Sequence, residues 1–175
     1  QTTAPILDRT FGQGSGQGYI ALAAGSIKNA TDEPDSTIAS AAQGALAFTV
    51  IPGSPDPQVL ILHTHATETY QTWDTPVYDP DFTARTKDTT LNMCAVGEAM
   101  TKVLNDAGIT TLHDTTLHDS PSYTESYARS AQTARRYLEE YPSIKVVLDV
   151  HRDALVGEDG TIYKPITTVN GEQAA

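Results

Sequence analysis

The most informative part of this sequence is the stretch Gln58-Val-Leu-Ile-Leu-His-Thr-His-Ala-Thr-Glu68. It opens with a short, continuous apolar run at residues 58–62, which is typical of a strand covered on both faces in a parallel sheet. Residues 144–150 are predicted to form another apolar strand, and His151 follows it directly. Two predicted strands therefore end in histidines, which makes their ends candidates for chemistry.

Two helical patterns lie between these strands. The first repeats apolar residues at spacings of three and four, which predicts a stripe facing a core: Met93, Val96, Met100, Val103 and Ala107. We expect this helix to begin near Asp88, Thr89 or Thr90 and to end before Gly108. The second pattern begins after Pro121, ends at Pro142 and has the stripe Tyr123, Tyr127, Ala131, Ala134, Leu138 and Tyr141.

A short strand is also predicted at residues 109–112, between the two helices. The order is then strand, helix, strand, helix, strand. Alternation of this kind predicts an α/β fold with a mostly parallel sheet flanked by helices.

Residues 1–56 follow a different pattern. The glycine-rich stretch 11–18 is expected to be a loop and not a phosphate-binding site, because no strand before it and no helix after it is evident. Short strands are predicted at 19–27 and 45–51. We therefore expect residues 1–56 to form an irregular region packed on the core, and residues 57–175 to form the α/β domain.

Composition excludes several classes of function. The 175 residues include 22 acidic and 11 basic ones, for a net charge of −11, which disfavours binding to nucleic acid or to an anionic membrane. The single cysteine, Cys94, excludes a disulfide within the chain and any multi-cysteine metal site. It lies in a helical pattern, so we expect a buried apolar residue and not a nucleophile. The sequence contains no run of 18 apolar residues, which is about the length that a membrane-spanning helix needs.

The histidines at the two strand ends suggest a metal site. In open α/β sheets, functional sites lie beyond the carboxyl ends of the strands. If both strands are parallel, His63, Glu68 and His151 share one edge and can converge. Two imidazoles and one carboxylate are a common catalytic zinc set, with the fourth position open for water. The chemistry this predicts is hydrolysis of an amide or ester.

The spacing leaves alternatives open. His63 is closer to the strand end than His65 and is preferred as the ligand, although His65 and Glu68 form an H-x-x-E pair that could share a helical face. His65 and Arg152 are then expected to contact substrate or to support the ligands. In the simpler interpretation, histidines at strand ends only form hydrogen bonds with loops.

A third polar segment, His113-Asp-Thr-Thr-Leu-His118-Asp119, also follows a predicted strand. His113 could join the metal, but we favour a structural or substrate-binding role for this segment. Three aromatic residues after the first motif, Tyr70, Trp73 and Tyr78, could line a groove or only pack their loop. No G-x-S-x-G motif is present, which argues against a serine nucleophile.

Four segments carry a resemblance to a known family. They are Val59-Leu-Ile-Leu-His-Thr-His-Ala-Thr-Glu-Thr-Tyr70, His113-Asp-Thr-Thr-Leu-His-Asp119, Pro121-Ser-Tyr-Thr-Glu-Ser-Tyr-Ala-Arg-Ser130 and Val146-Val-Leu-Asp-Val-His-Arg-Asp-Ala154. In this order they resemble the stage II sporulation protein P family, over roughly residues 20 to 175. The combination of H-T-H-x-T-E-S/T-Y with D-x-H-R-D is specific.

The resemblance implies an enzyme similar to zinc-dependent N-acetylmuramoyl-L-alanine amidases. Such an enzyme cuts peptidoglycan between the glycan lactyl group and the stem peptide, and can also cleave peptide cross-links. His63, Glu68 and His151 match the metal-ligand positions. The family is membrane-anchored, faces outward and acts during engulfment with stage II sporulation proteins D and M. On this basis the chain is expected to be an extracytoplasmic ectodomain.

One departure from the family pattern matters. The general-base glutamate of such amidases is expected beyond residue 175, and Glu172 lies in the wrong context. The tail 161–175 also shows no closing element. We therefore expect a C-terminally incomplete, poorly active domain. The alternatives are a non-catalytic peptidoglycan-binding or partner-docking module, and a metallocarboxypeptidase-like peptidase.

Overall fold

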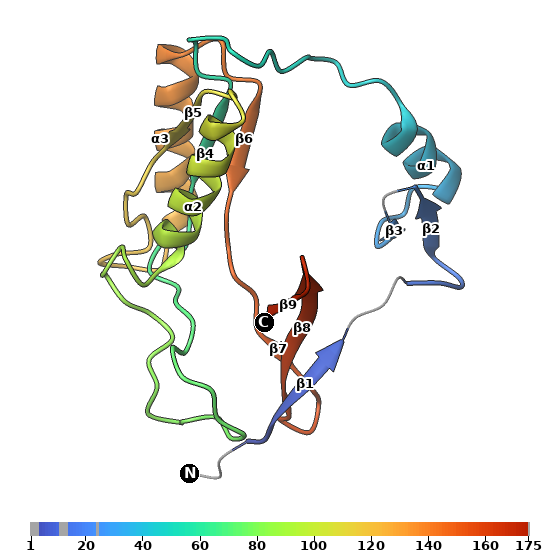
Figure 1. The fold of residues 1–175 in the computed structure, drawn as a ribbon, viewed down its shortest axis with the longest axis vertical. Helices are drawn as coiled ribbons and strands as arrows, with labels where there is room; N and C mark the ends of the chain where they lie inside the picture. The colour runs from blue at the N-terminus through green and yellow to red at the C-terminus, as the bar shows by residue number, and fades with distance from the viewer. Residues whose placement is uncertain (1–3, 11–13, 24, 175) are drawn as a thin grey trace. The chain divides into compact units, whose positions relative to one another are not determined.

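The chain folds into two compact units. The computed structural model describes residues 4–10, 14–23 and 25–174 (Figure 1). One unit consists of Gln1–Ala4 and Phe48–Ala154, and the other of Pro5–Ala47 and Leu155–Ala175. This division differs from the expected boundary after residue 56, because the C-terminal strands share a unit with the N-terminal ones. That the N-terminal region packs on the core stays a prediction.

The first unit contains the predicted parallel sheet. Its strands, in the order β5-β4-β6, are Thr111–His113, Val59–Leu62 and Val146–Asp149. Both neighbours run parallel to β4, with Leu60 opposite Leu112 on one side and Val147 on the other. All four residues of β4 are buried, as a central strand covered on both faces requires. The α/β class and the parallel sheet are confirmed.

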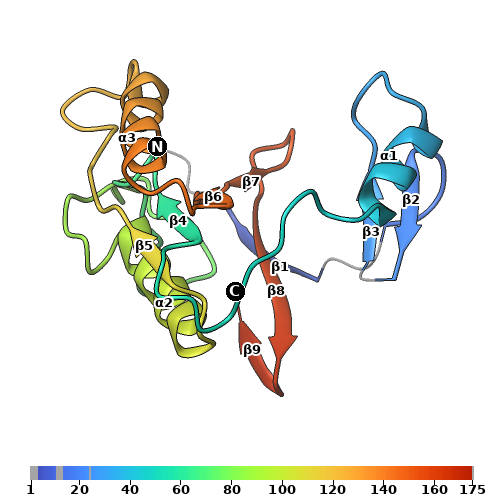
Figure 2. The same cartoon turned by 90° about the horizontal axis from the view of Figure 1, so that it is seen from above.

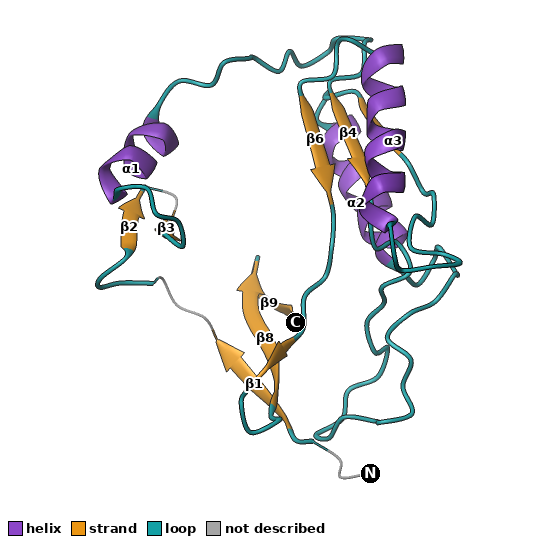
Figure 3. Ribbon diagram, turned by 180° about the vertical axis from the view of Figure 1, so that it is seen from behind, coloured by secondary structure: helices purple, strands orange, loops and turns teal. Residues whose placement is uncertain are grey.

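Two helices cover opposite faces of this sheet (Figures 2 and 3). Leu60 and Leu62 form a core with Ile144, and Ala134 and Tyr137 pack against it from α3, Ser126–Glu140. His63 instead approaches α2, Met93–Asp106, at Gly97. Side chains alternate along a strand, so Leu62 and His63 must face opposite helices.

The apolar stripe predicted for α2 is only partly correct. Met93 is buried, but Val96 and Val103 are 37% and 68% exposed. The buried positions of α2 are Met93, Cys94 and Gly97. The face that meets the sheet is therefore rotated toward the glycine, where the absence of a side chain lets the helix approach the histidines.

The predicted start of α2 was also wrong, whereas its end is as expected. Its N-cap is Asn92, not residue 88, 89 or 90, and the Asn92 side chain accepts a hydrogen bond of 2.9 Å from Cys94 N. At the other end Gly108 follows the last turn with φ +79°. A glycine is suited to this left-handed conformation because it has no Cβ.

Helix α3 begins at Ser126, several residues after the predicted start. Tyr123 and Tyr127 were expected on its buried stripe but are 59% and 63% exposed. Leu138 is also exposed. The buried positions include Ser126 and Ser130, since the helix start faces a polar part of the molecule and uses hydroxyl groups there.

The second unit is built from short strands and one helix. A sheet joins β1 (Ile6–Thr10), β7 (Leu155–Val156), β8 (Ile162–Val169) and β9 (Glu172–Ala174). A separate hairpin pairs β2 (Tyr19–Leu22) with β3 (Gly25–Lys28), and α1 is Asp35–Gln43. β1 runs parallel to β8, while β7 and β9 run antiparallel to it.

Sequence reasoning missed several of these elements. Residues 45–51 form no strand, and α1 was not predicted. The tail was expected to lack a closing element but forms β8 and β9. Asn170 and Gly171 join them with φ of +53° and +86°, the left-handed pair of a tight hairpin turn. This Asn-Gly pair was a readable signal.

None of the helices formed by the described residues is long and apolar enough to cross a membrane.

Candidate functional site

The candidate site lies where the three parallel strands end. β4 leads into His63, β5 ends at His113, and β6 is followed shortly by His151. Because all three strands run in the same direction, these residues are carried to the same edge of the sheet. The predicted gathering of His63 and His151 at one edge is therefore correct.

His63 is fully buried, and both of its ring nitrogens have partners. Nδ1 lies 2.9 Å from the backbone oxygen of Val150. A carbonyl only accepts, so we assign the proton to Nδ1, which leaves Nε2 with a lone pair. His118 Nδ1 donates to the His63 backbone oxygen at 2.8 Å and holds it in place. Burial lowers the pKa of His63, which favours the neutral, metal-binding form.

The residue that meets His63 Nε2 is His113. The two Nε2 atoms are 2.9 Å apart, and the rings meet edge to face. The His113 side chain is 5% exposed, and its Nδ1 lies 3.3 Å from Glu98 Oε2. The sequence suggested His113 only as one possible metal ligand, since strand register was needed to place it beside His63.

His65 and His151 form a second group with two tyrosines. The His65 ring stacks on Tyr123 with centroids 4.5 Å apart, and meets the edges of Tyr127 and His151 at 5.3 and 5.2 Å. Burial lowers the pKa of His65 as well. The edge of the sheet therefore carries four imidazoles in two contacting pairs.

Glu68 is held by groups of the protein. Its Oε1 lies 3.4 Å from the Arg85 guanidinium, and its Oε2 accepts from the Arg152 backbone N–H at 3.4 Å. Arg85 also binds Asp119 at 2.6 Å, and the Asp119 side chain is fully buried. Arg152 thus meets Glu68 through its backbone, while its guanidinium donates to Ala84 O at 3.4 Å.

Asp149 is a site residue that sequence reasoning did not single out. It lies 3.0 Å from His151 Nε2 and accepts two hydrogen bonds from Thr64. Burial alone would raise the pKa of Asp149, but the hydrogen bonds from Thr64 and His151 outweigh it and lower the pKa. The signal was present as Asp-Val-His, because residues two apart on a strand point to the same side.

The donor groups suit zinc chemically, but they do not surround a common point. In the described part of the chain, no three His, Cys, Asp or Glu side chains are grouped as a metal site would need. Glu68 faces Arg85, and His151 faces Asp149. His63, Glu68 and His151 as a ligand set therefore stay a prediction, and forming it would require these partners to be exchanged.

A model of the family "Stage II sporulation protein P (SpoIIP)" matches residues 20–175. The chain belongs to the stage II sporulation protein P family. Neither a curated protein nor a solved structure matches it. Membership gives it a sporulation-related, peptidoglycan-associated role, in a family associated with cell-wall hydrolysis.

The lone cysteine of this family member is placed as expected. Cys94 is 2% exposed, and burial raises the pKa of its thiol to about 11. A nucleophilic cysteine needs a thiolate and access to solvent. Cys94 has neither, so its role is in packing.

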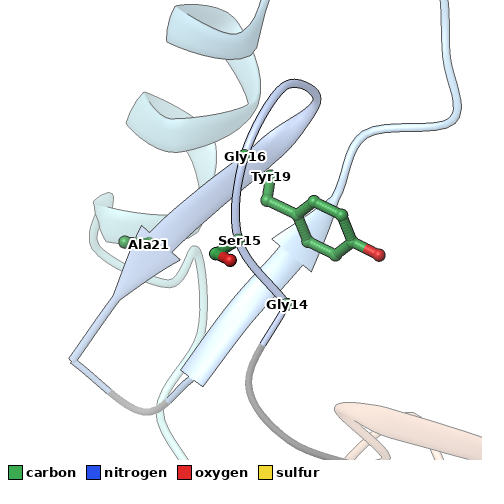
Figure 4. Close-up of a pocket in the computed structure, with 5 residues that line it drawn as sticks. All are labelled: Gly14, Ser15, Gly16, Tyr19 and Ala21. Atoms are coloured by element: carbon green, nitrogen blue, oxygen red, sulfur yellow. The ribbon is translucent and has the colours of Figure 1, made fainter.

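Two other features do not involve the histidines. Trp73 packs edge to face on Phe82 at 5.6 Å, and Tyr70 and Trp73 are half exposed. In the second unit a pocket is lined by Gly14, Ser15, Gly16, Tyr19 and Ala21 (Figure 4). These lining residues include no aspartate, glutamate, lysine, arginine or histidine.

Proposed function

We propose that this member of the stage II sporulation protein P family is a zinc-dependent hydrolase of peptidoglycan. Its reaction would be that of an N-acetylmuramoyl-L-alanine amidase, which cuts the amide between the glycan lactyl group and the stem peptide, with peptide cross-links as a further target. The proposal rests on family membership and on the four imidazoles and one carboxylate at a single sheet edge.

The observation that carries the proposal is the state of His63. Its Nδ1–H is committed to the Val150 carbonyl, so its buried Nε2 keeps a lone pair available. Fixing one ring nitrogen in this way is how proteins orient a metal-binding histidine. We propose zinc with His63, Glu68 and His151 as its ligands.

The remaining residues of the site would act around this centre. Bound zinc would supply a nucleophilic water at neutral pH and polarise the carbonyl under attack. His65 and Arg152 would contact substrate or support the ligands. Arg85 holds the Glu68 carboxylate in place through their contact at 3.4 Å. The general base is proposed to lie beyond residue 175, so the assay below uses the full-length protein.

By the same family membership, we propose that the protein acts outside the cytoplasm, anchored to a membrane. Stage II sporulation proteins D and M would be its partners. Co-purification of the tagged full-length protein from engulfing cells tests this, and absence of both partners would contradict it.

The activity is tested by incubating the full-length protein with zinc and purified peptidoglycan, followed by mass spectrometry of the products. New lactyl ends and free stem-peptide amines are expected, and their absence would overturn the proposal. His63→Asn should abolish both products. Lys102→Ala, which changes an exposed residue of α2, should leave them unchanged because its ion pair with Asp106 is on the surface.

A non-catalytic peptidoglycan-binding module is the second candidate. It is favoured by the protein partners that Glu68 and His151 already have. Binding to insoluble cell wall, in the presence of a chelator and without any product, would support it. Release of single C-terminal residues from ordinary peptides would instead support a metallocarboxypeptidase.

A further inference from the structure

We infer that His113 is a metal ligand alongside His63, with Gly97 providing the space for the ion. The inference rests on the proposed zinc site and adds to it a residue from β5. The ligand set His63, Glu68 and His151 does not explain why the Nε2 atoms of His63 and His113 lie 2.9 Å apart, and this inference does.

The Nδ1 atoms of both histidines face hydrogen-bond acceptors. His63 Nδ1 faces the Val150 carbonyl, and His113 Nδ1 faces the Glu98 carboxylate. Both partners only accept, so we assign the proton of each ring to Nδ1. In the neutral rings the two Nε2 atoms then face each other with lone pairs. Such an arrangement needs a positive species between or beside the nitrogens, which is a bound cation or an added proton.

The groups around the two histidines also resemble those around metal ligands. The His113 contact with Glu98 is an imidazole with a carboxylate on its far nitrogen, the arrangement that commonly orients metal-bound histidines. The His63 contact with a backbone carbonyl is the other common arrangement. Both rings of the pair are therefore oriented as metal ligands are.

Gly97 leaves space beside the two Nε2 atoms. A Cβ built on Gly97 would lie 2.5 Å from His63 Nε2 and closer still to His113 Nε2. Any other residue at this position would place carbon atoms against both nitrogens. Gly97 is buried within a helix, where glycine costs about 1 kcal/mol relative to alanine. The glycine keeps open the volume that a shared ion would use.

Among the described residues, neither Glu68 nor His151 forms a hydrogen bond with His63 Nε2. Within the described residues, the hydrogen-bond partners of the His63 side chain are Val150 and His113. Zinc binds imidazole nitrogen at about 2.0–2.1 Å, and two nitrogens 2.9 Å apart can both reach one ion at that distance.

The test measures zinc directly on the folded full-length protein. Zinc affinity is determined by competition with a chromophoric chelator, and the visible spectrum of the cobalt-substituted protein reports the ligands. His113→Asn and Gly97→Ala are each expected to weaken zinc by at least about tenfold and to change the cobalt spectrum. Circular dichroism and urea unfolding show that each variant is folded.

Two variants serve as controls. Ala99→Val adds carbon atoms to α2 at an exposed position and should keep wild-type zinc affinity. Lys102→Ala shortens an exposed side chain of α2 that pairs with Asp106 on the surface, and should keep the cobalt spectrum.

The inference is overturned if folded His113→Asn binds zinc as tightly as the parent with the same cobalt spectrum. In that case the 2.9 Å contact is a proton-sharing pair. Failure of the proposed function looks different: zinc that depends on His113, without any peptidoglycan product, leaves this inference intact. Products with unchanged zinc binding in His113→Asn leave the proposed function intact and remove this inference.

Discussion

The Asp149 carboxylate accepts two hydrogen bonds from Thr64, one from its backbone N–H at 2.8 Å and one from its hydroxyl at 2.7 Å. Thr64 follows β4 and Asp149 ends β6, so the pair fastens the ends of two parallel strands together. Thr64 lies between His63 and His65 in the chain, and Asp149 contacts His151. The positions of three histidines therefore depend on this contact.

Thr64→Val should destabilise the protein by about 1–3 kcal/mol. The variant keeps the shape but removes the hydroxyl that donates to Asp149 and contacts Ser130 Oγ at 2.6 Å. Thr64 is fully buried, so a carboxylate oxygen loses a donor that water cannot readily replace. Urea unfolding gives the value. Exposed Thr115→Val is the control and should change it by less than about 0.5 kcal/mol; equal effects would contradict the prediction.

Gly108→Ala should lower the free energy of unfolding by about 1–2 kcal/mol. Gly108 has φ +79°, and a Cβ there would lie 3.2 Å from Gly53 N. Gly108→Asn should cost less, because asparagine tolerates the left-handed conformation better than alanine does. Thermal unfolding of both variants checks the order, and an alanine variant as stable as the parent would refute it.

Cys94 should resist thiol reagents in the native protein. With a pKa of about 11 only about one thiol in a thousand is ionised at pH 8, and the side chain is buried. Reaction with a disulfide reagent should be slow in buffer and rapid and stoichiometric in urea. Rapid reaction of the folded protein would show that α2 opens readily from the sheet.

The metal-free protein should lose stability as the pH falls below about 6.5. The pKa of His63 and that of His65 are lowered in the fold, chiefly by burial. Below their ordinary value the unfolded chain binds more protons than the native one, so stability falls as pH falls. Urea unfolding at pH 7.5 and 5.5, with chelator present, measures the change. A His63→Gln variant should show a smaller decrease, and greater stability at pH 5.5 would contradict the assignment.

Much of the first unit could be predicted because its signals are local. The apolar segments before His63 and before His151 predicted two strands, and their order with the helices predicted a parallel sheet. A parallel sheet carries strand ends to one edge, so the gathering of histidines followed from sequence alone. The Gly108 helix end was predicted for the same local reason.

The rotation of the helices could not be predicted from periodicity. A stripe through Val96 and Val103 satisfies helical spacing as well as one through Met93 and Gly97. The choice depends on how closely α2 approaches the sheet, which Gly97 permits. On α3 the buried face begins with Ser126 and Ser130, because hydroxyl partners across the sheet outweigh the apolar tyrosines.

The sequence by itself determined the α/β class, the strands that lead into histidines, and membership of the family whose model matches residues 20–175. Only the tertiary structure decided which groups meet. In it, His113 contacts His63, and Asp149 contacts both His151 and Thr64. Arg85 pairs with Glu68. The contacts of His113 with His63 and of Asp149 with Thr64 depend on strand register, and they join residues 50 and 85 positions apart. Local propensity carries no information about contacts at such separations.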